Sequence, residues 1–165
     1  MFNVDIIAII AIMGGLFAVL AFIHFFVDWI FQSHSEAMVK HNNPKIRAKH
    51  CLIYTLGFVP LLALVGFSFY EWLIALNILF WSHFCEDTYL PVYYWAKWIR
   101  RPPEMTQPRK RTEVDGYVTI LPPDPKAGFV EFVQTPLGKI LMIAIDQIIH
   151  LAFLFPIAWM ILMHM

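Results

Sequence analysis

Histidine and aspartate recur four residues apart in three apolar segments of the chain. Residues 24–28 read HFFVD and residues 83–87 read HFCED, whereas residues 146–150 read DQIIH, the same pair in reverse order. In a helix, residues four apart lie one turn apart on the same face. Neutral imidazole and carboxylate are ligands that zinc, iron and manganese take from proteins. The spacing therefore predicts helices that each present a pair of metal-ligating groups.

A fourth apolar segment contributes one more imidazole, that of His50. The candidate metal ligands are therefore His24, Asp28, His50, His83, Asp87, Asp146 and His150. This set is larger than the ligand set of a single tetrahedral zinc ion. We expect either two ions, or one ion whose ligating imidazoles are oriented by the remaining residues and by Gln32 and Gln147. Zinc is the expected metal, with iron and manganese as alternatives.

Long apolar segments must position these side chains. The chain has 165 residues, of which 59% are hydrophobic and 15% are charged, whereas a soluble domain carries about 25% charged residues. A membrane-spanning helix needs about 20 mostly apolar residues. The segments that meet this requirement are residues 4–31, 48–69, 72–90 and 137–162. We therefore predict an all-α integral membrane protein, a four-transmembrane-helix bundle that forms a single domain over residues 1–165.

The segments that connect these spans differ in length and charge. So few residues join the second and third spans that these helices must form a tight antiparallel hairpin. All twelve Lys and Arg residues lie between residues 40 and 49 or between residues 97 and 139. The positive-inside rule then places the loops 32–47 and 91–136 in the cytoplasm and both chain termini outside.

The longer loop, residues 91–136, is rich in proline and basic residues. We expect it to be mostly irregular, with a short strand within residues 116–121. Pro91 is expected to end or kink the third span, and a short interfacial helix is expected beyond it. Thr135 and Pro136 are typical of the cap and first turn of a helix, here the fourth span.

This orientation brings the polar residues of the spans to one depth. With a rise of about 1.5 Å per residue and an apolar core about 30 Å thick, all the candidate ligands fall in the cytoplasmic half of the bundle. A metal site is the favoured interpretation. The alternatives are a hydrogen-bonded polar network that holds the helices together, a proton or ion pathway, and a haem held by paired histidines. A haem site leaves the regularly spaced aspartates without a role.

Several other residues have simpler interpretations. The two cysteines fall in apolar segments, which is typical of small buried hydrophobes and does not indicate a disulfide framework. His34 and His41 belong to the first cytoplasmic loop, where we expect them to be solvated. Glu86 points about 100° away from Asp87 on a helix, so we expect it either to ligate metal or to pair with a basic residue.

The ordered motifs resemble those of a family of small bacterial and phage membrane proteins, domain of unknown function family 3307. The matching features are HFFVDWIFQS at residues 24–33, a loop lysine (Lys40), a histidine opening the second span (His50), His-x-x-x-Asp at residues 83–87 and Asp-Gln-x-x-His at residues 146–150. The resemblance covers all the expected spans. It implies a multi-pass protein of the bacterial inner membrane, and the family name supplies no activity.

Two classes of function fit this layout. A metal-dependent hydrolase would use the metal to activate water and an unligated carboxylate as general base. The aromatic and basic stretch YYWAKWIRR, residues 93–101, would favour an anionic lipid headgroup or another membrane-associated substrate. The alternative is a non-catalytic protein that handles metal or ions, or that interacts with a host membrane, with the His/Asp face as a structural network. The basic run at residues 108–113 is typical of a solvated, membrane-proximal segment and does not indicate nucleic-acid binding.

Overall fold

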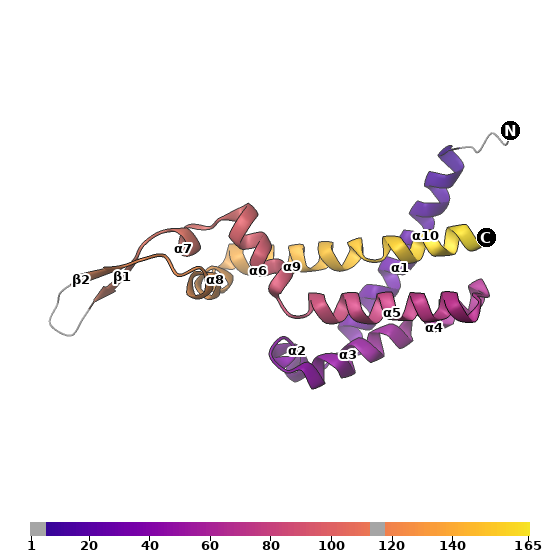
Figure 1. Ribbon diagram of the computed structural model, residues 1–165, viewed down its shortest axis with the longest axis horizontal. Helices are drawn as coiled ribbons and strands as arrows, with labels where there is room; N and C mark the ends of the chain where they lie inside the picture. The colour runs from indigo at the N-terminus through magenta and orange to yellow at the C-terminus, as the bar shows by residue number, and fades with distance from the viewer. Residues whose placement is uncertain (1–5, 113–117) are drawn as a thin grey trace. The chain divides into compact units, whose positions relative to one another are not determined.

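The computed structural model describes residues 6–112 and 118–165, which are mostly helical (Figure 1). These residues divide into two compact units. The first unit contains the chain up to Thr88 together with Ile148–Met165, and the second contains Tyr89–Gln147. The predicted helical class is confirmed, and each unit is described by itself below.

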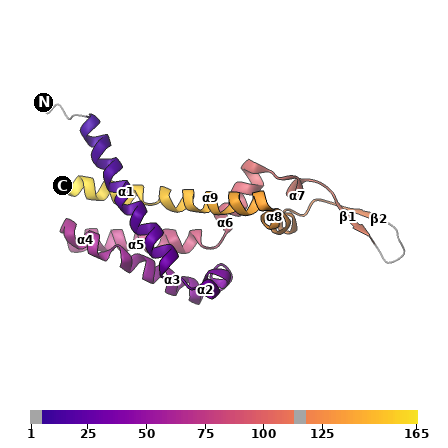
Figure 2. The same cartoon turned by 180° about the vertical axis from the view of Figure 1, so that it is seen from behind.

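The helices of the first unit follow the apolar segments of the sequence. They are α1 (Ile6–Ile30), α2 (His34–Val39), α3 (Pro44–Gly57), α4 (Val59–Val65), α5 (Phe69–Glu86), the end of α9 (Pro136–Ala152) and α10 (Phe155–His164). The second predicted span is thus divided into α3 and α4, and the fourth into α9 and α10. Within the unit, α1 packs against α3 and α10, and α3 packs against α5 (Figure 2).

Three helical stretches are long and apolar enough to cross a membrane. They are Ile6–Ile30, Pro44–Val65 and Pro136–His164. The third predicted span, residues 72–90, corresponds to α5, which is not one of the three. Its 18 residues include Glu71, Asn77, His83 and Glu86, and these polar side chains lower its mean hydropathy.

The predicted tight hairpin joins α4 and α5. Gly66 ends α4 with a φ of 80°, a left-handed conformation that suits glycine. Ser68 then caps α5: its hydroxyl accepts from the backbone N–H of Glu71, whose carboxylate accepts from the N–H of Ser68. These two devices let the chain reverse within three residues, 66–68.

The core of the first unit is apolar at one end and polar at the other. Its largest fully buried apolar side chains include Leu20, Phe58, Leu62, Leu79, Leu154, Ile157 and Ile161. Helix α3 approaches α1 so closely at Gly57 that a Cβ there would collide with the side chain of Val27. Val27 immediately precedes Asp28, so the close approach of the two helices helps to set the position of Asp28 at the polar end of the core.

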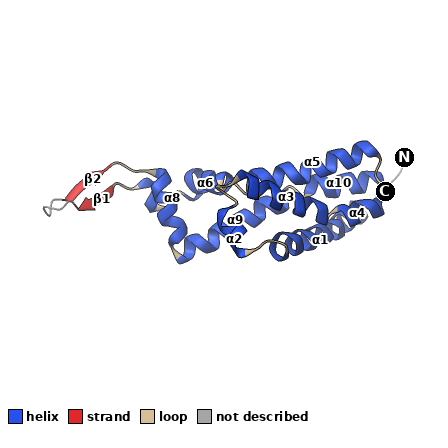
Figure 3. Cartoon of the chain, turned by 90° about the horizontal axis from the view of Figure 1, so that it is seen from below, coloured by secondary structure: helices blue, strands red, loops and turns tan. Residues whose placement is uncertain are grey.

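The second unit is more regular than the sequence suggested. It contains α6 (Leu90–Trp95), a π-helical turn (Ala96–Arg100), α7 (Pro103–Thr106), β1 (Arg109–Thr112), β2 (Val118–Leu121), α8 (Pro125–Gln134) and α9 up to Gln147. The strands pair antiparallel, with Arg109 opposite Leu121. Among the described residues they are the only strands (Figure 3), so the chain is not purely α-helical.

Several local predictions for this unit can be compared with the structure. The short helix after the third span is present as α6, with Pro91 in its first turn and Tyr89 at a φ of 61° before it. The Thr135 cap is confirmed, since its hydroxyl accepts from the N–H of Gly138 at 2.9 Å. The prediction that residues 91–136 are mostly irregular is wrong, because α7, β1 and α8 lie there. The short strand expected within residues 116–121 is present as β2 from Val118 onwards, and residues 116 and 117 lie outside the described residues. A small apolar core of Ala96, Met105 and Phe132 holds the unit together.

Candidate metal centre

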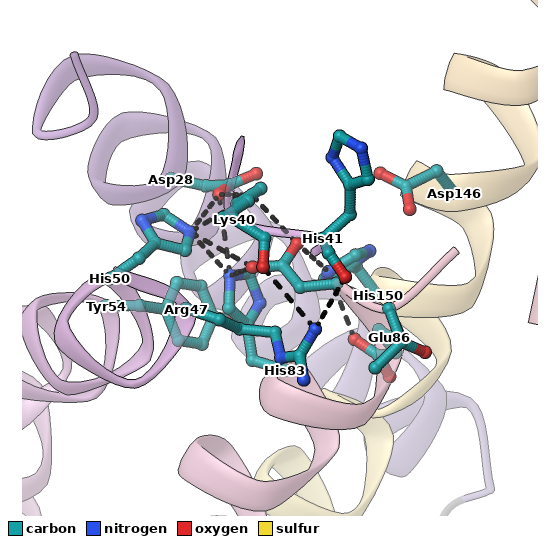
Figure 4. A network of polar contacts seen from close by, with 12 residues as sticks. Asp28, Lys40, His41, Arg47, His50, Tyr54, His83, Glu86, Asp146 and His150 are labelled. Carbon is teal, nitrogen blue, oxygen red and sulfur yellow. Dashed lines mark hydrogen bonds and ion pairs between the residues drawn. The ribbon is translucent and has the colours of Figure 1, made fainter. Parts of the chain in front are cut away.

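The polar end of the first unit gathers imidazoles and carboxylates from α1, α3, α5 and α9 (Figure 4). Seven of these side chains are at most 5% exposed, namely His24, Asp28, His50, His83, Glu86, Asp87 and His150. Six of them belong to the predicted ligand set. The remaining predicted ligand, Asp146, belongs to the second unit, where its carboxylate accepts from Gln147 Nε2 at 3.3 Å.

The centre of this cluster is formed by two imidazoles and a carboxylate. The Nε2 atoms of His50 and His83 lie 2.9 Å apart. Oδ1 of Asp28 lies 2.9 Å from His50 Nε2 and 3.5 Å from His83 Nε2. Helices α1, α3 and α5 each supply one of these groups, which is the convergence that the His-x-x-x-Asp spacing predicted.

Asp87 completes the centre from the end of α5. Its Oδ2 atom lies 3.6 Å from the Nε2 atoms of both His50 and His83. This oxygen is buried and has no hydrogen bond among the described residues. A buried carboxylate oxygen without a donor is costly, and a cation held near the two imidazole nitrogens would satisfy it.

The spacing of the four atoms matches a coordination shell. Zinc binds imidazole nitrogen and carboxylate oxygen at about 2.0–2.2 Å, so ligand atoms at the corners of a tetrahedron lie about 3.3 Å apart. The five distances above run from 2.9 to 3.6 Å. These five of the six separations among the four atoms therefore suit ligands of one ion.

Tyr54 supports the centre from the next turn of α3. Its ring lies flat on the imidazole of His83, with the ring centroids 3.8 Å apart and the planes 8° apart. Its hydroxyl lies 3.1 Å from Nδ1 of His24. Sequence reasoning missed Tyr54, although its position four residues after His50 places it on the same face of α3. Tyr54 therefore contacts both His83 and His24.

A cation from the first loop lies beside the centre. Lys40 Nζ is 2.8 Å from Asp87 Oδ1, 3.3 Å from His50 Nε2 and 3.8 Å from Asp28 Oδ1. The turn that carries Lys40 is held by Arg47, whose guanidinium donates to the carbonyl of His41 at 3.0 Å and packs over a ring of α5. The sequence singled out Lys40 only as a feature of the family resemblance.

His41, in the same turn, has a lowered pKa. Partial burial lowers the pKa of the imidazole, and the positive charges of Arg47 and Lys40 lower it further. The side chain is therefore biased towards its neutral form, contrary to the expectation of a simply solvated histidine.

Glu86 and His150 form a second contact next to the centre. His150 Nε2 lies 3.3 Å from Glu86 Oε2 and 3.8 Å from Asp87 Oδ1. Glu86 approaches only α9 in these contacts, whereas Asp87 contacts the loop and α3 as well as α9. The 100° between the two residues on α5 thus directs them to different neighbours within one cluster, rather than removing Glu86 from it.

Among the described residues, three groups have ligand atoms within 4.8 Å of one another. They are Asp28, His50 and His83; Cys51, His83 and Asp87; and His83, Glu86 and His150. His83 belongs to all three, whereas His24 belongs to none. Cys51, expected as a small buried hydrophobe, is buried as predicted but also lies beside the centre. Buried groups of the first unit thus have the composition and spacing to hold a metal ion.

Comparison with known proteins identifies a family but no activity. The family model described as protein of unknown function, DUF3307, matches residues 16–119. The match includes every residue of the cluster except His150. No curated protein and no solved structure shows significant similarity to the chain.

Proposed function

The chain belongs to the DUF3307 family of proteins of unknown function, and we propose that it is a membrane-embedded protein that binds divalent metal. The ligands of this proposed site are Asp28, His50, His83 and Asp87. The observation that carries the proposal is the set of contacts of 2.9–3.6 Å that joins their four buried donor atoms. Such spacing without a cation would leave Asp87 Oδ2 buried and unsatisfied.

Zinc is the metal that the donor set suits best. Two neutral imidazoles and two carboxylates are ligands that zinc accepts in tetrahedral geometry, and the two negative charges balance the ion. Iron and manganese accept the same nitrogen and oxygen donors. A nearby thiol, that of Cys51, also favours zinc over the harder ion magnesium.

The membrane arrangement proposed for the protein has four spans. Helix α5 packs against α3 and α10, each of which belongs to a stretch long and apolar enough to span. A helix packed in this way can carry His83 and Glu86 across a bilayer because both are buried against the bundle. Asn77 is exposed and donates to the carbonyl of Leu73 in its own helix. The distribution of Lys and Arg then supports cytoplasmic loops at 32–47 and 91–136 and outward termini, in a bacterial inner membrane.

A second candidate function is metal-dependent hydrolysis of a membrane-associated substrate. The second unit contains a cavity of about 270 Å³ that is lined by Lys97, Trp98, Arg101, Met105, Thr106 and Pro125. Two cations beside an aromatic ring suit an anionic lipid headgroup. Independently of this cavity, the metal held in the first unit would activate water, and Lys40 would stabilise negative charge near it. A non-catalytic protein that handles metal or ions would use the same centre without a reaction.

Metal content tests the proposal. The full-length protein, purified in detergent under metal-replete conditions, is analysed for zinc, iron and manganese, and an optical spectrum is recorded. We expect at least about one equivalent of metal, lost in His50→Ala and in Asp28→Asn. His164→Ala is the matched control, because His164 contacts Glu71 and lies outside the cluster.

The other outcomes separate the alternatives. A Soret band would replace the proposed site with a haem site. Folded wild-type protein without metal, together with variants that are only less stable, would mean that the His/Asp face is a structural polar network, and both the metal site and the hydrolase would be abandoned.

A further inference from the structure

We propose that the cluster holds two metal ions, with Glu86 and His150 as ligands of the second and Asp87 bridging the pair. The inference rests on the proposed function for the first ion. It adds a second site with donors of its own and a class of ligand that a two-ion centre would bind.

The donors of the second site come from α5 and α9. His150 Nε2 and Glu86 Oε2 lie 3.3 Å apart, which is the separation expected for two ligand atoms bound to one ion at about 2.0–2.2 Å. Both side chains are at most 4% exposed. Glu86 and His150 form a group with His83, which also belongs to the group of Asp28 and His50, so the two sites would adjoin at His83.

Asp87 lies between the two sites. Its Oδ2 atom is 3.6 Å from His50 and His83 Nε2, whereas its Oδ1 atom is 3.8 Å from His150 Nε2. The two oxygens of one carboxylate therefore face different sets of donors. Paired ions in proteins sit about 3.5–4 Å apart, and a carboxylate that presents one oxygen to each ion suits that spacing.

Lys40 is the internal cation that the second ion would displace. Its ammonium lies 2.8 Å from Asp87 Oδ1, the oxygen that faces His150. The ammonium is carried by a turn between α2 and α3 on a flexible four-carbon stem, so it can withdraw when a divalent ion arrives. Lys40 would thus satisfy the bridging carboxylate whenever the second site is empty.

Charge indicates what a two-ion centre would bind. The three carboxylates of Asp28, Glu86 and Asp87 and the ammonium of Lys40 leave two net negative charges. One divalent ion balances them, whereas two divalent ions give one net positive charge once the ammonium of Lys40 has withdrawn. A buried excess of positive charge requires an anion, and the natural partners are hydroxide and an oxyanion such as a phosphate ester. A centre with two ions would therefore suit the hydrolysis of phosphate-containing substrates.

Metal stoichiometry tests this inference separately from the first site. The full-length protein in detergent is stripped with a chelator and titrated with Zn²⁺, and in parallel with Mn²⁺ for electron paramagnetic resonance. We expect about two equivalents in the wild type and about one in His150→Ala and in Glu86→Gln. The wild-type Mn²⁺ spectrum should show exchange coupling between the ions, and Asp87→Asn should abolish it.

A second His–Glu pair provides the matched control. His164 Nδ1 lies 3.0 Å from Glu71 Oε1, away from the cluster, so His164→Ala and Glu71→Gln should leave about two equivalents. Glu86→Gln keeps the shape of the side chain, and therefore remains informative if His150→Ala fails to fold. One equivalent in the wild type, unchanged in His150→Ala, would overturn the second site and leave the first intact. No bound metal in folded wild type would overturn both.

Discussion

The ring of Tyr54 lies flat on the imidazole of His83, 3.8 Å between centroids and 8° between planes, while its hydroxyl meets His24 at 3.1 Å. One side chain therefore fixes the orientation of a proposed ligand by its face and contacts a second histidine by its edge. Residues that orient ligands in this way affect metal affinity without bonding to the metal.

Tyr54→Ala should therefore weaken metal binding rather than abolish it. Loss of the stacked ring frees the His83 imidazole to rotate, and we expect the metal affinity to fall by about 10- to 100-fold. Tyr54→Phe keeps the ring and removes the hydroxyl contact with His24, so its affinity should stay closer to that of the wild type. Competition with a chromogenic chelator measures both. Equal losses in the two variants would show that the hydroxyl, and not the stacking, is what matters.

Gly57 controls how closely α3 approaches α1. A Cβ at this position would collide with Val27, the residue before Asp28, so Gly57→Leu should push apart the helices that carry Asp28 and His50. We expect a loss of about 1–3 kcal/mol in the free energy of unfolding, together with weaker metal binding.

Gly15→Leu is the control for this substitution. A Cβ at Gly15, also on α1, would meet nothing within 4 Å, and this variant should keep the affinity of the wild type. Thermal unfolding in detergent and the chelator competition measure the two effects. If both leucine variants bind metal equally well, the distance between α1 and α3 does not control the site.

Much of the first unit could be predicted from the sequence because its signals are local. Length and apolar composition indicated where helices run, and the depth of each polar residue in its span indicated that the seven candidate ligands would converge. Six of them are buried together in the first unit, whereas Asp146 belongs to the second unit. Glu86 was harder to assign, because a helix with neighbours on several sides uses more than one face. In residues 91–136 the helix α6 and the strand β2 were expected, whereas α7, β1 and α8 were missed because the core of the unit is small and β1 is a short strand in a basic run.

Glu36 gives a pH-dependent contact between α2 and α3. Hydrogen bonds from Lys49 and then from Ser33 lower the pKa of its carboxyl from 4.5 to about 2. Because the pKa is lower in the folded state, the stabilisation is fully present above pH 4.5 and is lost as the pH falls through about 2. Glu36→Gln should therefore unfold at a lower temperature than the wild type at pH 7, with the difference shrinking as the pH falls from about 4.5 to about 2. A difference that stayed constant over this range would contradict the assignment.

Lys40→Met should raise the affinity for metal. The ammonium lies within 4 Å of Asp28, His50 and Asp87, so a divalent ion that enters the cluster meets a like charge at close range. At an effective dielectric constant of about 20, two unit charges about 4 Å apart interact by about 4 kcal/mol. We therefore expect removal of this charge to tighten metal binding by at least about tenfold, and to destabilise the metal-free protein because the carboxylates lose their counter-ion.

Lys45→Met is the control for the charge itself, because Lys45 belongs to the same basic segment and is exposed at the start of α3. Isothermal titration of chelator-stripped protein gives the affinity, and thermal unfolding with and without metal gives the stability. Weaker binding in Lys40→Met, with Lys45→Met unchanged, would mean that the ammonium supports the ligand geometry instead of competing with the ion. Lys40 would then be a positioning residue, and the charge balance argued for two ions would have to be redrawn around it.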